Sequence, residues 1–316
     1  MTGPRRCGGA MTARWNTPSG HQWTIEAGTQ RVTLVEIGGG IREYTVNGRD
    51  VLAGYPADAM ASKGVGQILA PWPNRIRDGK YTFDGRDHKL GWDETDKRTA
   101  IHGLVRWELW DRMDHTPTAV TLARTIQPRP GYPFALVLRV HYSLGKDGLK
   151  VEHQAVNAGP TPAPFGLGIH PFLTIGGEAL DAATLTLPAG KRVLVDDRLL
   201  PTGELEDVTG TEWDFRSGRT LGGVSLDTPF VVTERGSDSL AVSELVDAEG
   251  RGGQLWQDSS FGWVQAYNGI GPSGVANHAV AVEPMTCPPD AFNSGEGLIT
   301  LAPGEKWTGT WGVRPL

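Results

Sequence analysis

Four short segments of the chain carry polar side chains that strand formation alone does not explain. Three of them are Gln67–Gly79, Ile101–Trp107 and Phe165–Phe172. The fourth, Val280–Asn293, ends an alternating strand at Glu283, whose strand neighbours are apolar. A carboxyl in such surroundings is expected to be partly buried, and burying a charged group is costly. We therefore take these segments as the candidate functional part of the chain.

The elements that must position these segments are short strands. Every second residue of Ala135–Leu144 is apolar, and Leu149–Asn157 alternates in the same way. This is the period of a strand with one buried face, and the Gly-Lys-Asp-Gly sequence between the two runs is typical of a tight turn, so a hairpin is predicted. Similar strands are predicted at Arg31–Ile37, Ile41–Val46, Ala119–Ile126, Thr184–Leu187, Leu240–Leu245, Trp263–Tyr267, Ala279–Glu283 and Trp307–Val313.

The arrangement of these strands predicts an all-β fold, a large antiparallel β-sandwich with few short helices. Asn47-Gly48 predicts a second hairpin, and helical periodicity is nowhere sustained over three turns. We expect one domain over residues 15–316, after a disordered extension at residues 1–14. The longest irregular stretches are expected to be functional loops, namely Leu52–Arg75, Leu90–Gly103 and Leu199–Asp227.

Composition excludes several classes of partner. The formal net charge of −6 is spread along the chain without basic blocks, which argues against binding of nucleic acid. No apolar stretch approaches the length of a membrane span, and residues 1–14 lack the apolar core of a secretory signal. The two cysteines, Cys7 and Cys287, predict no disulfide framework. We therefore expect a cytoplasmic protein, and its oligomeric state stays open.

Cofactor motifs are also missing from the sequence. The run Gly38-Gly39-Gly40 follows a strand, but another strand comes next, whereas a dinucleotide or phosphate loop needs a helix there. We interpret the run as a turn. Neither GxSxG, HExxH nor GxxxxGK[ST] occurs, which leaves serine hydrolase, zinc protease and P-loop chemistry without support. We expect no metal and no other cofactor.

The polar segments occur in a familiar order. PWPNRI is followed by DGKYTFDG, then by IHGLVRW, GIHPF, LDTPF and EPMTCPPDAFNSGEGLITLAPGE. In this order they resemble the aldose 1-epimerase (galactose mutarotase) family, from about Gln67 to the end of the chain. Each piece alone is a weak signal, whereas the ordered set is a strong one. The resemblance, and not periodicity, implies a sugar substrate and a two-layer supersandwich with a sugar-binding cleft on one sheet face.

The same resemblance implies the roles of individual residues. Glu283 matches the general base of the family and His170 its general acid. Four residues match the positions that bind the sugar, with His102 near the ring oxygen: Arg75, His102, Asp227 and Asn74. Trp72, Trp107 and Trp263 are expected to pack in the core.

Mutarotation explains why these residue types are needed. The anomeric hydroxyl loses a proton while the ring oxygen gains one, so the ring opens to an aldehyde and recloses as the other anomer. Burial raises the pKa of a carboxylate near an apolar wall, and a histidine beside it can be protonated around neutral pH. Glu283 and His170 form a plausible pair of this kind, and the reaction requires no cofactor.

Two other classes of function stay open at this point. A glycoside hydrolase also uses a pair of carboxylates, for which Glu283 with Asp227 or Asp258 are candidates. A noncatalytic sugar-binding protein would keep Arg75 and Asp227 but has no need of both members of an acid–base pair. Release of reducing sugar from an aryl glycoside distinguishes the first, because a mutarotase changes only optical rotation.

The charge of the substrate depends on where a few cations point. Glucose-6-phosphate epimerases are similar to this family in fold, but the PWPNRI segment resembles the free-sugar branch more. Bacterial sulfosugar mutarotases share the GQxLAPWPNRI, HGLVRW and EPMTCPPDAF style of motif. Arg77, Lys63 and Arg106 lie in or beside the polar segments without an assigned partner. If they face solvent, which is the commoner place for Lys and Arg, a neutral aldohexose such as glucose or galactose is expected. If one or two face the cleft, an anionic hexose is expected instead.

Overall fold

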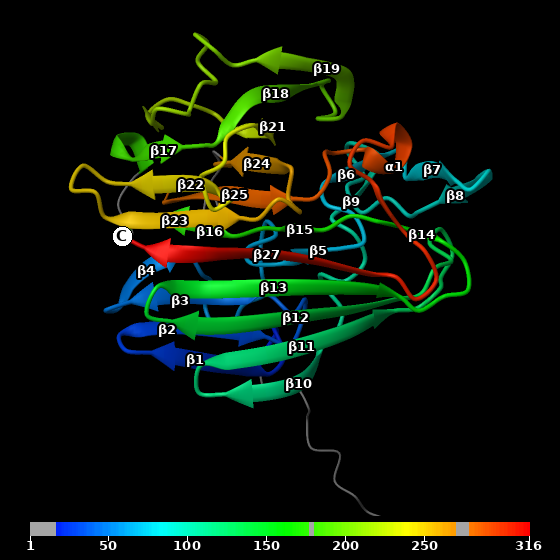
Figure 1. The fold of residues 1–316 in the computed structure, drawn as a ribbon, viewed down its shortest axis with the longest axis horizontal. Helices are drawn as coiled ribbons and strands as arrows, with labels where there is room; N and C mark the ends of the chain where they lie inside the picture. Colours follow the sequence, from blue (N-terminus) through cyan, green and yellow to red (C-terminus); the bar gives the residue numbers. More distant parts are fainter. Residues whose placement is uncertain (1–16, 177–179, 270–277) are drawn as a thin grey trace, which may run out of the picture.

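Two large antiparallel sheets make up most of the molecule. The computed structural model describes residues 17–176, 180–269 and 278–316, so our expectation for residues 1–14 lies outside the described part of the chain. Each large sheet contains strands from distant parts of the sequence, and Figure 1 shows the two sheets as stacked layers. The all-β sandwich predicted from the sequence is confirmed.

The twelve-stranded sheet provides the floor of the site. Its strands, in spatial order, are β1 (Gln22–Ala27), β2 (Gln30–Val35), β3 (Ile41–Val46), β4 (Arg49–Leu52), β16 (Phe172–Thr174), β25 (Ala279–Met285), β24 (Trp263–Tyr267), β21 (Asp227–Val232), β18 (Ala189–Val195) and β19 (Pro201–Asp207). Two short strands attach beside β25, namely β15 (Gly168–Ile169) and, paired to it, β5 (Ile68–Leu69).

The nine-stranded sheet covers the other side of the core. Its strands, in spatial order, are β10 (Asp111–Thr116), β11 (Ala119–Ile126), β12 (Leu136–Gly145), β13 (Gly148–Asn157), β27 (Lys306–Pro315), β23 (Gly252–Gln257), β22 (Ala241–Val246), β17 (Thr184–Thr186) and β20 (Arg219–Thr220). Buried residues of both sheets form one hydrophobic cluster, because each sheet turns its alternating apolar face inward.

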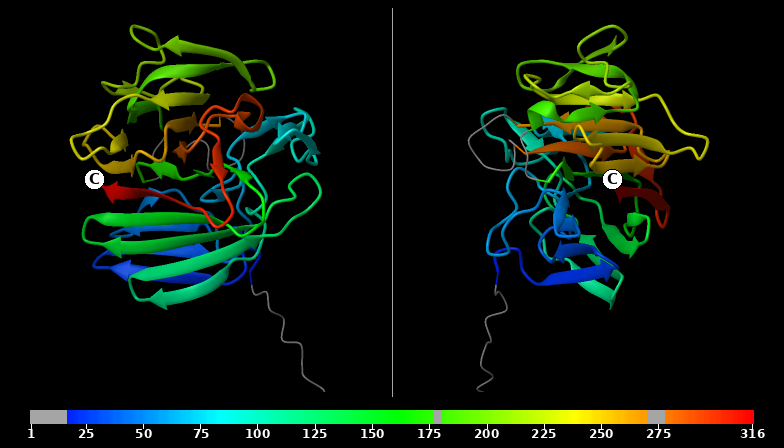
Figure 2. Two further views of the ribbon diagram at one scale, coloured as in Figure 1. Left: turned by 45° about the vertical axis from the view of Figure 1, so that its right-hand side comes forward. Right: turned by 90° about the vertical axis from the view of Figure 1, so that its left-hand side faces the viewer.

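Three small two-stranded sheets complete the strand list. They are β14 (Ala163–Phe165) with β26 (Ile299–Leu301), β6 (Arg75–Arg77) with β9 (Thr99–Ile101), and β7 (Lys80–Phe83) with β8 (Arg86–Lys89). Helix in the described part of the chain is limited to α1 (Ala291–Ser294) and a 3-10 turn at Leu180–Ala182. Figures 1 and 2 show β6 to β9 beside α1, to one side of the large sheets. None of the described helices has the length and apolarity to span a membrane.

Strands with a clear alternating pattern lie where the sequence predicts them. β3, β11 and β24 have the predicted bounds, and β12 and β13 pair through the predicted turn with Gly145 opposite Gly148. The alternating apolar residues of β12 are buried. The Asn47-Gly48 hairpin is also confirmed, with positive φ angles of 52° and 77° at the two turn residues.

The three predicted loops are not entirely irregular, which corrects the sequence interpretation. The first contains β5, the second contains β9, and the third contains β19 and β20. The interpretation also omitted β10, an edge strand whose residues are all exposed. Strands of two or three residues, and strands with no buried face, leave no alternating signal in the sequence.

The run Gly38-Gly39-Gly40 is a turn between β2 and β3, as predicted, and it also supports the loops of the site. A Cβ on Gly40 would lie 2.2 Å from the carbonyl oxygen of Gly66, and one on Gly38 would lie 2.6 Å from that of Arg106. Both distances are shorter than any real contact of a Cβ. The turn therefore needs glycine because two other segments pack directly on its backbone.

Candidate active site

Strand pairing gathers polar side chains on the twelve-stranded sheet, with Gln265, Glu283 and His170 in one row and Asp227 beside Tyr267 in the next. Asp227 of β21 pairs with Tyr267 of β24, and Gln265 of β24 pairs with Glu283 of β25. On the far side of β25, Gly168 pairs with Met285 and Phe172 with Ala281. His170 lies midway between Gly168 and Phe172, so it occupies the position opposite Glu283. Because strands alternate their faces, this register turns the polar side chains to one side.

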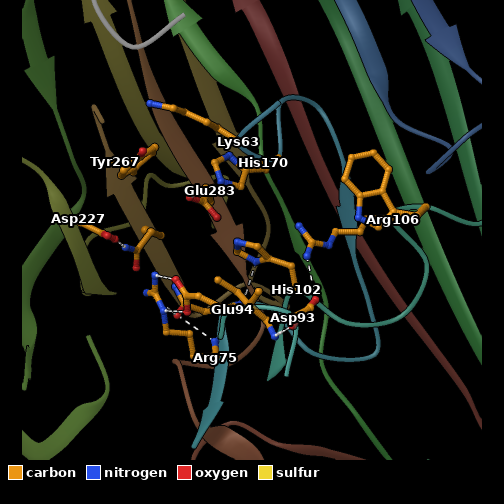
Figure 3. Close-up of a pocket in the computed structure, with 15 residues that line it drawn as sticks. Lys63, Arg75, Asp93, Glu94, His102, Arg106, His170, Asp227, Tyr267 and Glu283 are labelled. Carbon is orange, nitrogen blue, oxygen red and sulfur yellow. Dashed lines mark hydrogen bonds and ion pairs between the residues drawn. The ribbon is translucent and has the colours of Figure 1, made fainter. Parts of the chain in front are cut away.

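Loops from the first third of the chain close this row into a pocket of about 310 Å³. Figure 3 shows the side chains converging on it. All six residues that the sequence singles out line this one pocket: Asn74, Arg75, His102, His170, Asp227 and Glu283. The other lining residues are Lys63, Gly64, Asp93, Glu94, Ile101, Arg106, Trp107, Gln265 and Tyr267.

The centre of the pocket is a contact between His170 and Glu283. Nε2 of His170 lies 3.3 Å from Oε1 of Glu283, and the two side chains are only 5% and 2% exposed. Oε2 of Glu283 and Nδ1 of His170 are buried and have no hydrogen-bond partner among the described residues. Unsatisfied buried polar atoms are rare in folded proteins and call for a specific reason. A ligand in the pocket would supply the missing partner for the carboxylate.

Burial shifts the pKa values of this pair in opposite directions. Desolvation, followed by the negative charge of Asp227, raises the pKa of Glu283 well above its ordinary value, against the opposing effect of Arg75. Desolvation lowers the pKa of His170 to about 3, against the raising effect of a backbone hydrogen bond. Burial therefore favours a neutral imidazole at pH 7, which differs from the protonated histidine that we expected. The raised pKa of Glu283 favours its protonated form.

The raised pKa of Glu283 predicts a pH-dependent cost to stability. In the unfolded chain its pKa returns to about 4.5, so between that value and the raised folded value only the folded protein keeps the proton. The free energy of unfolding therefore falls as pH rises through this window. Glu283→Gln has no such proton, so its Tm relative to the wild type should rise as pH increases above about 4.5, by roughly 1–2 °C for each kcal/mol relieved in a chain of this length. Thermal melts across this range check the prediction, which a pH-independent difference would contradict.

A pair of reciprocal hydrogen bonds fixes the second histidine. The backbone N–H of Asn74 donates to Nδ1 of His102 over 3.2 Å, and the backbone N–H of His102 donates to the carbonyl of Asn74 over 2.9 Å. Both residues have positive φ angles, 52° and 61°. Since Nδ1 accepts a hydrogen bond, the neutral ring carries its proton on Nε2. Desolvation is the main cause that lowers the pKa of His102 well below its usual value, and its neighbours His170, Arg106 and Arg75 add to the effect, so this ring is a neutral donor.

His170 is held on several sides by neighbouring groups. Its ring stacks on Phe172 with a centroid distance of 5.0 Å, and His102 meets it edge to face at 5.5 Å. Gly64 covers another part of the ring, with a φ of 80°, and a Cβ there would lie 2.5 Å from Cδ2 of His170. Only glycine both adopts this conformation readily and leaves room for the imidazole.

The opposite part of the pocket contains two polar pairs that the sequence analysis did not anticipate in full. Arg75 forms a two-point ion pair with Glu94, and Nε2 of Gln265 donates to Oδ1 of Asp227 over 2.6 Å. Glu94, Gln265 and Tyr267 were missed. The only sequence signal for Glu94 was its place in a predicted functional loop, and Gln265 was hidden as a polar residue within a strand. Register with Glu283 would have identified Gln265, but the strand pairing was unknown.

The three candidate cations have different surroundings. Arg77 turns away from the pocket and pairs with Asp196 and Asp290, at 3.3 and 3.6 Å. Arg106 lines the pocket and pairs with Asp93 at 2.8 Å. Lys63 also lines it, and has no ion pair or hydrogen bond within the described ranges of the chain. The expectation that these cations face solvent therefore does not hold for Lys63 and Arg106.

Trp107 corrects a second expectation, because it does not pack in the core. Its side chain is 46% exposed and lines the pocket, with the Arg106 guanidinium carbon 5.6 Å from the ring centroid. Trp72 is buried as expected, and Trp263 is half-buried. An exposed indole beside a polar pocket offers an apolar face to a ligand.

Two residues considered from the sequence lie outside the pocket. The carboxylate of Asp258 accepts hydrogen bonds from the backbone of Ser260 and Thr310, so it is not brought together with Glu283. Cys287 is buried, and burial raises the pKa of its thiol to about 12. Within residues 17–176, 180–269 and 278–316, no group of three or more His, Cys, Asp or Glu side chains is arranged to hold a metal ion.

Comparison with known sequences places this geometry in context. The model of the aldose 1-epimerase family matches residues 21–314. The chain is 34% identical over 288 residues to "Uncharacterized protein YihR" from Escherichia coli, a match that covers 91% of both proteins. It is 31% identical over 166 residues to the galactose mutarotase of Homo sapiens, which covers 50% of this chain and 46% of the human protein.

Solved structures share the fold. A GalM/aldose epimerase homologue from C. elegans superposes with a TM-score of 0.81 at 23% identity. The superposition covers 94% of this chain and 99% of the nematode chain. At this level of identity the likeness speaks for the fold alone.

Proposed function

The chain belongs to the aldose 1-epimerase family, and from this premise we propose that it interconverts the α and β anomers of a free aldohexose. The observation that carries the proposal is the buried contact between Glu283 and His170, at the centre of a pocket whose other polar groups suit sugar hydroxyls. Opening the sugar ring requires one group that removes a proton and one that supplies a proton. This pair provides both, within 3.3 Å of each other.

The proposed reaction conserves the single proton of the pair. The proton first moves from Glu283 to His170 across their contact. Glu283 then takes the proton of the anomeric hydroxyl while His170 protonates the ring oxygen, and the bond between C1 and the ring oxygen breaks. The pair is thereby returned to its starting state, beside the open aldehyde. Rotation about C1–C2 and the reverse transfers close the ring as the other anomer. The protonated Nε2 of His102 is proposed to donate a hydrogen bond to the sugar near its ring oxygen.

The remaining predicted residues are proposed to hold the sugar. Arg75 offers a guanidinium and Asp227 a carboxylate, the donor and the acceptor that hydroxyl groups require. Asn74 accepts hydrogen bonds from the backbone and side chain of Arg75 through Oδ1, at 2.9 and 3.5 Å, so its amide orients the arginine. Holding the substrate in this way turns proton transfer into a reaction between fixed partners.

Polarimetry tests this function against the two competing classes. Freshly dissolved α-anomer should reach its equilibrium optical rotation faster in proportion to added protein, and p-nitrophenyl glycosides should stay intact. Cleavage of the aryl glycosides would identify a hydrolase, for which Glu283 and Asp227 are candidate carboxylates that line the pocket. Binding of sugar without any change in rotation rate would identify a noncatalytic sugar-binding protein.

A second candidate substrate class, an anionic hexose, is favoured by the position of Lys63 and Arg106. Both line the pocket, and Lys63 has no anionic partner within the described part of the chain. Arg106 already forms an ion pair with Asp93, so Lys63 is the cation that a substrate anion would pair with most favourably. A charge-assisted hydrogen bond contributes roughly 1.5–3 kcal/mol, which corresponds to about ten- to a hundredfold in affinity.

Substrate charge gives a quantitative prediction. If the substrate is anionic, kcat/KM for sulfoquinovose or glucose 6-phosphate should exceed that for glucose and galactose by about tenfold, because Lys63 would supply one charge-assisted contact. Lys63→Met should remove this advantage and leave kcat/KM for glucose within about threefold of the wild type. Anomer-exchange NMR on the four sugars measures both. Equal or better use of the neutral sugars would assign the protein to neutral aldohexoses.

A further inference from the structure

Glu94 makes the most extensive side-chain contacts in the pocket. Its Oε2 accepts from Nε of Arg75 over 2.7 Å, and its Oε1 accepts from NH2 of Arg75 over 2.9 Å. The hydroxyl of Thr99 donates to Oε2 over 2.6 Å. The side chains of Arg75 and Glu94 are 9% and 18% exposed. Figure 3 shows Glu94 on the pocket side of this pair. The arrangement is a two-point ion pair, which fixes the plane of the guanidinium.

The loop that carries Glu94 is anchored from both ends. Backbone hydrogen bonds join Glu94 to Thr99, where β9 begins. Arg198, from the turn between β18 and β19, donates to the carbonyls of Lys97 and Arg98 and to the Asp78 carboxylate. Burial raises the pKa of Glu94, but the hydrogen bonds from Arg75 and Thr99 and the charge of Arg75 outweigh it, so the net pKa is lowered and the carboxylate is ionised.

The ion pair leaves one donor and one acceptor with spare capacity. Among the described residues, NH1 of Arg75 has a single long hydrogen bond, 3.5 Å to Oδ1 of Asn74. Oε1 of Glu94 accepts one hydrogen bond from this part of the chain, whereas a carboxylate oxygen can accept two. Vicinal hydroxyl groups of a sugar offer the complementary acceptor and donor at neighbouring carbons.

We propose that Glu94 is a sugar-binding residue that acts with Arg75 as one unit, orienting the guanidinium and accepting a hydrogen bond from a ring hydroxyl. The proposal rests on the proposed function, since it concerns the same pocket. It assigns a carboxylate that the ordered sequence motifs did not include. It also explains why Arg75 is committed to an internal ion pair and yet lines the pocket.

Glu94 has a second effect, on the charge near the reacting pair. The charged or titratable groups that face Glu283 are His170, Asp227, Arg75 and Tyr267. Of these, only Arg75 lowers the pKa of Glu283. Glu94 partly neutralises that guanidinium. If Glu94 becomes uncharged, the positive charge of Arg75 acts more fully on Glu283, whose pKa should fall.

Glu94→Gln tests the proposal with a nearly isosteric side chain. For glucose, kcat/KM should fall by roughly ten- to a hundredfold, mainly through KM, because a charge-assisted contact is lost. The same comparison is made with 2-deoxy-, 3-deoxy- and 4-deoxyglucose. One of these sugars lacks the hydroxyl that Glu94 binds. The variant and the wild type should have almost equal kcat/KM for that sugar, because the contact is already absent and the substitution removes nothing further. The alkaline limb of the pH–rate profile should also move to lower pH.

Matched variants separate binding from a structural role. Glu206→Gln removes the carboxylate of another arginine pair, with Arg192 on the β18–β19 hairpin, and should leave kcat/KM and the pH profile unchanged. Thr99→Val removes one hydrogen bond from Oε2 and should give a smaller loss of the same kind, which keeps the test decisive if Glu94→Gln folds poorly. Equal losses on glucose and on all three deoxy sugars, with an unmoved alkaline limb, would overturn the proposal. If the wild type itself fails to exchange anomers, the proposed function fails instead.

Discussion

Glu283→Gln is expected to lower kcat for anomer exchange by at least about a hundredfold, with a smaller change in KM. The amide has nearly the shape of the carboxyl, so it preserves the contact with His170, but it cannot remove the proton of the anomeric hydroxyl. The expected gain in thermal stability at higher pH provides an internal control, because it shows that the variant is folded and that the loss is chemical. Near-wild-type exchange by a folded Glu283→Gln would exclude this residue as the base.

His170→Asn is expected to lower kcat by at least about a hundredfold as well, because within the described part of the chain His170 is the group that pairs with Glu283 and could deliver the proton to the ring oxygen. Asparagine keeps a polar group of moderate size between Phe172 and Gly64. The double variant with Glu283→Gln should be far less impaired than the product of the two single losses, since each single change already disables the pair.

Progress curves at saturating sugar measure all three variants. Multiplicative losses would show that the two residues act in separate steps, contrary to the shared-proton reaction. A His170→Asn variant with unchanged kcat would assign the role of acid to another residue of the pocket. His102 is a candidate, because its ring centroid lies 5.5 Å from that of His170.

The strand that carries Glu283 was predictable from the sequence because its side chains are mostly apolar, whereas the short strands on either side of His170 were not predicted. Residues Ala279–Glu283 were predicted as a strand, and β25 extends two residues further, to Met285. β24 and β25 are consecutive in the sequence, but sequence alone could not pair β25 with β16, which comes from a distant part of the chain. That pairing places His170 in the same row as Gln265 and Glu283.

The loop residues were predictable only in part. His102, Asn74 and Arg75 were identified through ordered motifs, and the structure places all three at the pocket. Glu94 lies in a polar stretch, Leu90–Gly103, that contains several acidic residues, and composition gives no reason to prefer one of them. Its importance depends on the ion pair with Arg75, which forms only when β6 and β9 pair. The same lack of tertiary information explains why Lys63 and Arg106 were expected at the surface and Trp107 in the core.

The protonation of His170 shows a similar limit. A histidine next to a glutamate suggests an imidazolium when burial is ignored. The pair is instead almost completely buried, and desolvation opposes the charged form of both groups. Burial thus favours the neutral forms of both groups, and in the proposed reaction their ion pair forms only transiently.

Exchange NMR at equilibrium tests the central claim most directly. With glucose, galactose, glucose 6-phosphate and sulfoquinovose each at anomeric equilibrium, magnetisation transfer between the α and β H1 signals reports interconversion without any net change in composition. The proposed function predicts exchange that increases in proportion to wild-type protein for at least one of these sugars, and that falls to near the uncatalysed rate with Glu283→Gln. Exchange that is independent of wild-type protein for all four sugars would contradict it.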